Sequence, residues 1–266
     1  MFCSYVEGED GAAIRCDGRQ SVGHPELNDV RTATSVGPFI EGVDNDVRCC
    51  SGCAGYPAAE RQFGSAVAEG DLRRYQNKGP DATSRLLLTS IGEHLESGDS
   101  LLDVGGGVGV VAFELLSKGA SNATLVDASP AYLKAAEGEA VRREQSDRIR
   151  CVPGDFVAIA DSLAAADVVT MHRVICCYPN HIALLQRAAD HTRRVLGFSY
   201  PRDRWFVRWW LALENRWRRL TGSDFRTFVH SPAAMEETVV QGGFRRLSRR
   251  LTLVWSIDLY GRTDSA

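Results

Sequence analysis

The chain has 266 residues, of which 44% are hydrophobic and 24% are charged, and its formal net charge is −3. This balance is typical of a globular protein and excludes a fibre or a coiled coil. The weakly acidic charge gives no reason to expect a nucleic-acid partner. No apolar run reaches about 18 residues, so we expect no membrane-spanning helix.

Residues 1–55 are rich in Gly, Ser, Asp and Glu and hold few large apolar residues, which predicts a mostly disordered tail. The tail lacks the apolar stretch of a signal peptide, so we expect a cytoplasmic protein whose eight cysteines are free thiols. Cys49, Cys50 and Cys53 suggest a metal motif, but a structural zinc site commonly needs two spaced pairs. We therefore predict no metal and assign residues 56–266 to one domain.

Two helices are expected first, at about 58–76 and 81–97. Short apolar runs then alternate with helical stretches, which favours parallel strands joined by crossover helices. The predicted strands are Ser100–Val104, Ala123–Asp127, Ile149–Val152, Asp167–Met171 and Val195–Tyr200, and the helices lie near 109–118, 130–143, 157–164 and 181–193.

The last part of the chain differs from this repeat. A helix rich in Trp and Arg is predicted at 202–220, a short helix at 232–241, and closing strands at Phe244–Ser248 and Leu251–Tyr260. The whole pattern predicts an α/β fold, in which a doubly wound, mostly parallel seven-stranded sheet carries helices on both faces. A helical cap, at about 202–241, would lie between strands five and six.

A glycine-rich loop, Asp103-Val-Gly-Gly-Gly-Val-Gly109, joins the first strand to the next helix. Glycines allow a tight turn and a close approach of ligand to backbone, and the helix start offers free N–H groups. The glycines that matter are Gly105, Gly107 and Gly109. A dinucleotide fingerprint, G-x-G-x-x-G, would need glycine at position 110, which is Val, and this spacing argues against a nicotinamide-dependent oxidoreductase.

The loop resembles the D-x-G-x-G-x-G loop of class I methyltransferases that depend on S-adenosylmethionine (SAM), which have a Rossmann-like fold. The resemblance implies that Asp103 holds the amino-acid end of SAM. It implies that Asp127, followed by Ala128, bonds the ribose hydroxyls at the end of the second strand. Asp155 would lie near the adenine amino group, and Phe156 would flank the adenine ring.

The segment after the fourth strand usually lines the methyl-transfer site in this family, and the resemblance covers roughly residues 80–200. Many relatives read E-V-L-x-H-V-P-D there, whereas Arg173 replaces the Glu and Cys177 replaces the His. The run Arg173-Val-Ile-Cys-Cys-Tyr-Pro, with Tyr200-Pro-Arg-Asp further on, looks closest to the magnesium-protoporphyrin and quinone O-methyltransferase branches.

Methyl transfer to a neutral hydroxyl needs a base, and an imidazole suits that role. His172, at the cofactor end of the fourth strand, is the first candidate and His181 the second, although His172 could equally pack under the sheet edge. Tyr178 lines the substrate pocket or fills core, and Cys177 lines the pocket. Arg173 pairs with a substrate carboxylate or with an acid of the chain. A carboxylate acceptor would need no base.

The 202–220 helix carries an apolar stripe at three- or four-residue spacing, and arginines occupy much of the rest. The stripe comprises Trp205, Trp209, Leu213, Trp217 and Leu220. The helix is interpreted first as a lid whose stripe packs on the domain, with Trp205 and Trp209 near the substrate. It could instead lie on a membrane surface or form a dimer surface.

The leading hypothesis is therefore O-methylation of a small aromatic or lipophilic acceptor, porphyrin-like or quinone-like, with SAM as the methyl donor. The alternatives are a non-catalytic SAM-binding regulatory module and a methyltransferase of another small metabolite. Membrane contact through residues 202–220 would make the cytoplasmic protein membrane-associated. The sequence does not indicate an oligomeric state.

Overall fold

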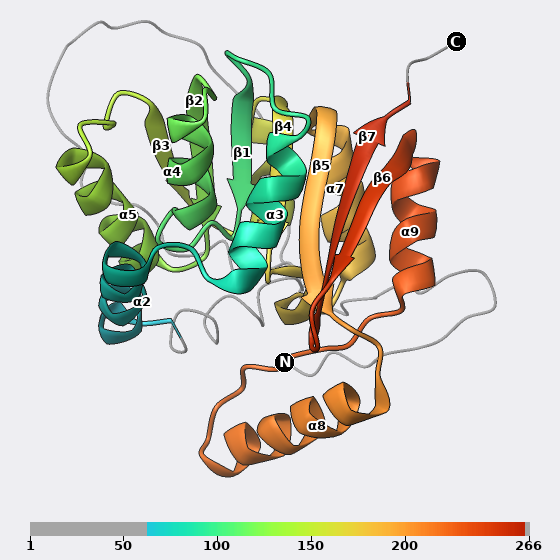
Figure 1. Cartoon of the computed structure of the whole chain (residues 1–266). Helices are drawn as coiled ribbons and strands as arrows, with labels where there is room; N and C mark the ends of the chain where they lie inside the picture. The colour runs from blue at the N-terminus through green and yellow to red at the C-terminus, as the bar shows by residue number, and fades with distance from the viewer. Residues whose placement is uncertain (1–62, 264–266) are drawn as a thin grey trace, which may run out of the picture. The chain divides into compact units, whose positions relative to one another are not determined.

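The structure is a computed structural model that describes residues 63–263. The predicted tail, with Cys49, Cys50 and Cys53, lies outside the described residues. One seven-stranded sheet forms the centre of the described part, in the order β3-β2-β1-β4-β5-β7-β6 (Figure 1). The strands are β1 (Ser100–Val104), β2 (Asn122–Asp127), β3 (Ile149–Pro153), β4 (Ala166–His172), β5 (Thr192–Pro201), β6 (Phe244–Leu251) and β7 (Trp255–Arg262).

Strands β1 to β5 pair in parallel, whereas β7 pairs antiparallel with both β5 and β6. The predicted doubly wound, mostly parallel seven-stranded sheet is therefore confirmed. The helices of the described residues are α2 (Ser65–Lys78), α3 (Ala82–Gly92), α4 (Val110–Ser117), α5 (Pro130–Arg142), α6 (Phe156–Ile159), α7 (His181–Asp190), α8 (Trp205–Leu220) and α9 (Pro232–Gln241).

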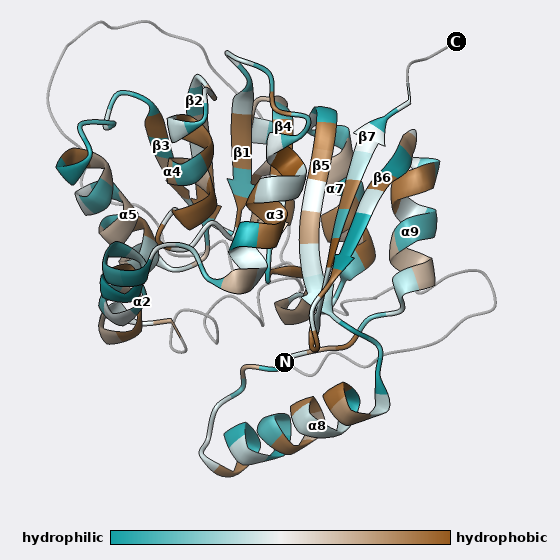
Figure 2. Ribbon diagram, in the orientation of Figure 1, coloured by the Kyte–Doolittle hydropathy of each residue, from teal (hydrophilic) through white to brown (hydrophobic). Residues whose placement is uncertain are grey.

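Two hydrophobic cores cover the two faces of the sheet, as Figure 2 shows by its brown inner surfaces. One core joins α3, α4 and α5 to the sheet through residues such as Leu87 and Leu115. The other joins α6, α7 and α9 to the opposite face through residues such as Leu185 and Val239. Because both faces are covered, the central strands are continuously apolar, which is why their sequence reads as unbroken hydrophobic runs.

Local chemistry sets where the helices begin. The Asp81 side chain accepts the Ser84 N–H at 2.9 Å and caps α3, and Ser129 caps α5 ahead of Pro130. The predicted end of the second helix at residue 97 is wrong: α3 ends at Gly92, after which the His94 N–H turns back to the Ile91 carbonyl at 2.9 Å.

The predicted boundary between the closing strands is also wrong. Leu251 belongs to β6, and the turn lies at 252–254, where Thr252 Oγ1 accepts the Trp255 N–H at 2.8 Å. The Arg-rich run after Ser248 reads as a polar turn in the sequence. It is instead part of an edge strand, where charged side chains are well tolerated.

Strands β2 and β4 flank β1, so the order of connection reverses beside β1. Ligands of open α/β sheets bind at such a reversal, beyond the carboxyl ends of the strands. The loop between β1 and α4 lies at this point. Helix α8, between β5 and β6, lies at the same end of the sheet (Figure 1), as predicted for the cap.

Candidate active site

The glycine loop needs glycine at the three positions that the spacing singled out. Gly105, Gly107 and Gly109 have left-handed φ angles of 64°, 56° and 82°. A Cβ atom on Gly105 would lie 2.3 Å from the Val174 side chain, and one on Gly109 would lie 2.7 Å from Phe113. The backbone angle therefore favours glycine at all three positions, and packing adds to this requirement at Gly105 and Gly109.

Asp103 presents a buried carboxylate beside this loop. Its Oδ1 accepts the Thr170 hydroxyl at 2.6 Å, whereas its buried Oδ2 has no hydrogen-bond partner among the described residues. Burial, with the nearby Asp127 charge adding to it, raises the pKa of Asp103 to about 7. A buried anionic oxygen without a donor is costly alone, so it suits a cationic ligand group such as the ammonium of an amino acid.

Asp127 ends β2 with both carboxylate oxygens held by backbone donors. Gly107 N–H reaches one oxygen at 2.9 Å, and Ser129 N–H reaches the other at 2.8 Å. Burial raises the pKa of Asp127, and these two N–H groups oppose that rise. Each oxygen keeps a free lone pair, so the carboxylate can accept from two neighbouring hydroxyls, as a ribose diol requires.

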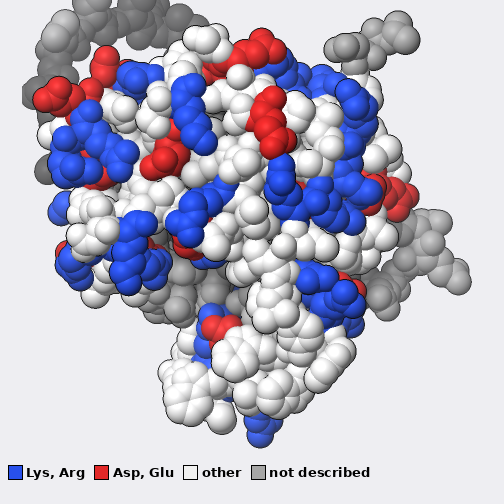
Figure 3. Space-filling model, viewed as in Figure 1, with Lys and Arg blue, Asp and Glu red and all other residues white. Residues whose placement is uncertain are grey.

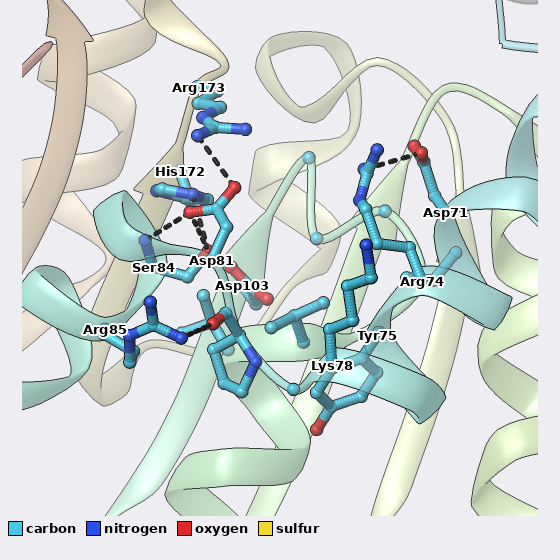
Figure 4. A pocket seen from close by; sticks show the side chains of 18 of the residues that line it. Asp71, Arg74, Tyr75, Lys78, Asp81, Ser84, Arg85, Asp103, His172 and Arg173 are labelled. Carbon is cyan, nitrogen blue, oxygen red and sulfur yellow. Dashed lines mark hydrogen bonds and ion pairs between the residues drawn. The ribbon is translucent and has the colours of Figure 1, made fainter.

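A cavity of about 490 Å³ opens between Asp103, the loop and helices α2 and α3 (Figure 4). Arg173 lines it, together with three cations of α2 and α3: Arg74, Lys78 and Arg85. Sequence reasoning missed these cations because they lie on the helices before β1. The cap at Asp81, which directs the start of α3 into the site, was the available signal.

His172 lies at the end of β4 within a chain of hydrogen bonds. Its Nδ1 is 3.0 Å from Ser199 Oγ, and its Nε2 is 3.1 Å from Ser84 Oγ. Ser84 also donates to Asp81, and Ser199 accepts the Arg173 N–H, so consistent donation places the ring proton on Nε2. Burial lowers the pKa of His172 to about 4, so the imidazole is neutral near pH 7.

Arg173 and His181 differ in how well they meet the sequence predictions. Arg173 pairs with Asp81 at 2.8 Å and stacks on Trp255, so it takes an acid of the chain, which was one of the two predicted partners. His181 does not line the cavities, because its ring stacks on His230 with centroids 3.9 Å apart. The geometry therefore does not favour His181 as the alternative base, and that role stays a prediction.

A larger cavity, of about 950 Å³, runs from the glycine loop to the cap. Its cofactor end is lined by Asp127, Ala128, Asp155, Phe156 and His172, and the resemblance implies this position for most of them. Further along, the cavity is lined by Cys177 and Tyr178. The Tyr178 hydroxyl donates to both Asp155 oxygens, at 3.0 Å each, and the Asp155 side chain caps α6. These contacts fix Asp155 at the rim of the cofactor end.

The cap covers this cavity with a different face from the one predicted. The inner face of α8 holds the buried Val207, and the cavity is lined by Phe206, Leu211, Glu214 and Arg218. The predicted stripe faces outward instead. Trp209 touches the cavity from its rim, but Trp205 is 80% exposed and does not line it. The predictions that the stripe packs on the domain and that Trp205 contacts substrate are therefore wrong. Helical spacing shows that the apolar residues share a face, and says nothing about what that face meets.

The comparisons with known proteins agree with this geometry. The profile of a methyltransferase domain family matches residues 72–238. The chain therefore belongs to the methyltransferase domain family, and the predicted class, a SAM-dependent methyltransferase, is confirmed. A comparison with curated protein sequences finds no match.

Solved structures show the same fold at low sequence identity. A magnesium protoporphyrin IX methyltransferase of Synechocystis PCC 6803 with bound SAH is 17% identical, with a TM-score of 0.60 over 79% of this chain and 100% of its own. An O-methyltransferase family protein of Burkholderia thailandensis is 14% identical, with a TM-score of 0.61 over 79% of this chain and 63% of its own. An O-methyltransferase family 2 protein of Planctomyces limnophilus, in complex with apigenin, is 17% identical, with a TM-score of 0.55 over 79% and 66%.

Proposed function

We propose that the enzyme transfers the methyl group of SAM to a carboxylate oxygen of a flat, lipophilic aromatic acceptor, porphyrin-like or quinone-like. The carrying observation is the cavity of about 950 Å³ that joins the glycine loop to walls of aromatic and aliphatic side chains. The likeness to a porphyrin methyltransferase and to an O-methyltransferase in complex with apigenin supports this acceptor class.

The residues at the strand ends fit SAM. Asp103 would hold the ammonium with its partnerless oxygen, and Asp127 would accept both ribose hydroxyls. Asp155 and Phe156 would lie along the adenine. SAM supplies an electrophilic methyl group on a sulfonium, and this chain's contribution is to orient that group toward the wider part of the cavity.

The acceptor end of the cavity is apolar with a few charged groups. Its walls include Val174, Tyr178, Phe206, Trp210, Leu211, Phe225, Leu253 and Trp255. Its charged groups are paired: Arg218 donates to Glu214 and to Thr227, and Arg173 pairs with Asp81. Apolar walls of this extent favour a large aromatic ligand and exclude water from the reacting atoms.

The state of His172 favours an acceptor oxygen that is already ionised. Both ring nitrogens have hydroxyl partners, so removing a substrate proton would first require breaking one of these bonds. A carboxylate needs no base, because its oxygen lone pair forms the C–O bond while the C–S bond breaks and its electron pair returns to sulfur. The products are a methyl ester and S-adenosylhomocysteine, with no proton transferred.

The experiment is transfer of labelled methyl from SAM to paired acceptors that share one flat ring system and carry either a carboxylate or a phenol. We expect label on the carboxylate as a base-labile methyl ester, at a rate that, with saturating SAM, varies little between about pH 6 and 9. The His172→Gln variant, which keeps a hydrogen-bonding side chain there, should retain most of this rate.

Two outcomes would overturn the proposal. Transfer to the phenol alone, with a pH-dependent rate that His172→Gln abolishes, would assign His172 as the general base. Binding of SAM without turnover of either acceptor class would favour the regulatory module.

A further inference from the structure

We propose that the outer face of α8 docks on a membrane surface that contains anionic lipids. This face, called the tryptophan face below, consists of Trp205, Trp209, Trp210, Leu213, Trp217 and Leu220. It holds four of the five tryptophans of the chain. Trp205 and Leu220, near its two ends, are 80% and 73% exposed, so the face is open along the whole helix.

An exposed face of this kind is unusual for a protein surface. Large side chains scattered singly over a surface need no explanation, whereas a contiguous set of four indoles on one helix marks a binding surface. In Figure 3 the part of the surface formed by α8 is mostly white, with a few blue and red groups at its margins, so uncharged residues dominate it. Indoles favour the membrane interface, because the ring is apolar and the N–H remains hydrated.

The charges beside the tryptophan face match an anionic lipid surface. Arg204, Arg216 and Arg219 of this segment are exposed, and so is Arg208, which pairs with Asp203 just before the helix. The acid within α8, Glu214, lines the cavity on the inner side and pairs with Arg218. A helix with tryptophans on one face and arginines along its flank is the pattern of a helix that lies in the plane of the interface.

The tryptophan face continues into the mouth of the larger cavity. Two of its tryptophans, Trp209 and Trp210, are exposed and also line the cavity. The same is true of Leu253 and Val254 on the β6–β7 turn. The Arg202 N–H donates to the Val254 carbonyl at 2.7 Å, which joins the start of α8 to this turn. A membrane in contact with the tryptophan face would therefore lie against the mouth of the larger cavity. A lipophilic molecule could then pass between the lipid and the cavity without crossing water.

The charges favour a lipid surface over a second copy of the chain. In a symmetric pair the tryptophan faces would meet, and the flanking arginines of one copy would lie against those of the other. No helix in the described part of the chain has the length and hydropathy of a membrane span. The proposed contact is therefore peripheral, and it is independent of which acceptor the enzyme methylates.

The test is co-sedimentation of the full chain with vesicles of phosphatidylcholine alone or with phosphatidylglycerol added. We expect binding to the anionic vesicles and a blue shift of tryptophan emission. The triple variant Trp205→Ser/Trp217→Ser/Leu220→Ser and the double variant Arg216→Glu/Arg219→Glu should each bind more than tenfold more weakly. Matched controls are Val141→Ser and Arg245→Glu, which alter an exposed apolar residue and an exposed arginine on other elements.

Unchanged SAM affinity in these variants would show that the fold and cofactor site are intact, because none of the altered residues lines a cavity. The proposal is overturned if the protein does not bind anionic vesicles, or if the variants bind as the wild type does. It is also overturned if the protein binds no vesicles but forms dimers that the triple variant abolishes, since the tryptophan face would then pair with a second copy.

Discussion

The two ends of the active-site cavity are built in different ways. At the cofactor end, the acids lie at or near strand ends of the packed sheet, and backbone N–H groups of Gly107 and Ser129 hold both oxygens of Asp127. At the cap end, α8 itself is held through side chains to the segment that follows it. Asn215 exchanges two hydrogen bonds with the Thr227 backbone, and Arg218 bonds the Thr227 hydroxyl and stacks on Phe225.

This difference separates the recognition of donor and acceptor. Backbone donors on a packed sheet cannot move independently, so the donor site is pre-organised for one ligand. A helix attached by side chains can change its lining residues without disturbing the sheet, which suits a variable acceptor site. The predictions below test whether the two ends are energetically separate.

The largest effect is expected for Asp127→Ala. The variant loses both acceptors for the ribose hydroxyls and the anchor of the Gly107 N–H, so SAM affinity should fall by about 100-fold, from two hydrogen bonds to a charged group. Isothermal titration calorimetry measures it. Asp161→Ala, which removes an exposed acid paired with Arg187, is the control and should bind SAM normally. Normal affinity in Asp127→Ala would contradict the assignment of the ribose site.

For Asp103→Asn we expect a smaller loss of SAM affinity, about 30-fold at pH 7.5. The substitution removes the negative charge that would hold the ammonium group of SAM. Since the pKa of Asp103 is raised to about 7, the wild-type carboxylate becomes protonated below pH 7. SAM affinity should therefore fall by up to about tenfold per pH unit below 7. Titrations between about pH 6 and 7.5 measure it, below the deprotonation of the SAM amino group. An equal pH dependence in Asp103→Asn would exclude Asp103 as its source.

The cofactor end could be predicted from the sequence because its chemistry is local. The spacing of Gly105, Gly107 and Gly109 is set by the backbone angles of one turn, and Asp127 follows a strand that is recognisable by itself. The fold was predictable for the same reason, since strands buried on both faces are unbroken apolar runs. The boundaries failed where a turn without a distinctive residue ends an element, as it does after Gly92 at the end of α3.

The rest of the site could not be predicted, because it depends on packing between distant segments. The partners of His172, Ser84 and Ser199, lie 88 and 27 residues away along the chain. The placement of α8 involves distant segments on both sides: the Arg202 N–H before the helix donates to the Val254 carbonyl, and the Phe228 N–H after it donates to the Cys176 carbonyl. Periodicity within one helix contains no information on such contacts.

The cap end is tested by Asn215→Ala. Loss of the two bonds to Thr227 should loosen α8 and raise the KM for the acceptor by about tenfold, at about 0.7 kcal/mol for each bond lost. SAM affinity should stay within about twofold of wild type if the two ends are energetically separate. Steady-state kinetics with saturating SAM, and calorimetry for SAM, give the two values. An equal loss of SAM affinity would show that the cap also builds the donor site.

We expect the smallest effect for Ser199→Ala, a substitution between the cofactor end and the cap end of the cavity. Ser199 Oγ joins the Arg173 N–H to His172, so its loss leaves a ring nitrogen and a backbone donor without their partner. A cost of about 1–2 kcal/mol should lower Tm by roughly 2–6 °C. If His172 only positions the β4 end, kcat for a carboxylate acceptor should fall about threefold and its pH profile should stay flat.

The control Ser162→Ala removes an exposed hydroxyl that bonds only a local carbonyl, and should change neither value. A newly pH-dependent kcat in Ser199→Ala would instead mean that the imidazole takes part in proton transfer, because freeing Nδ1 would expose its titration to the reaction.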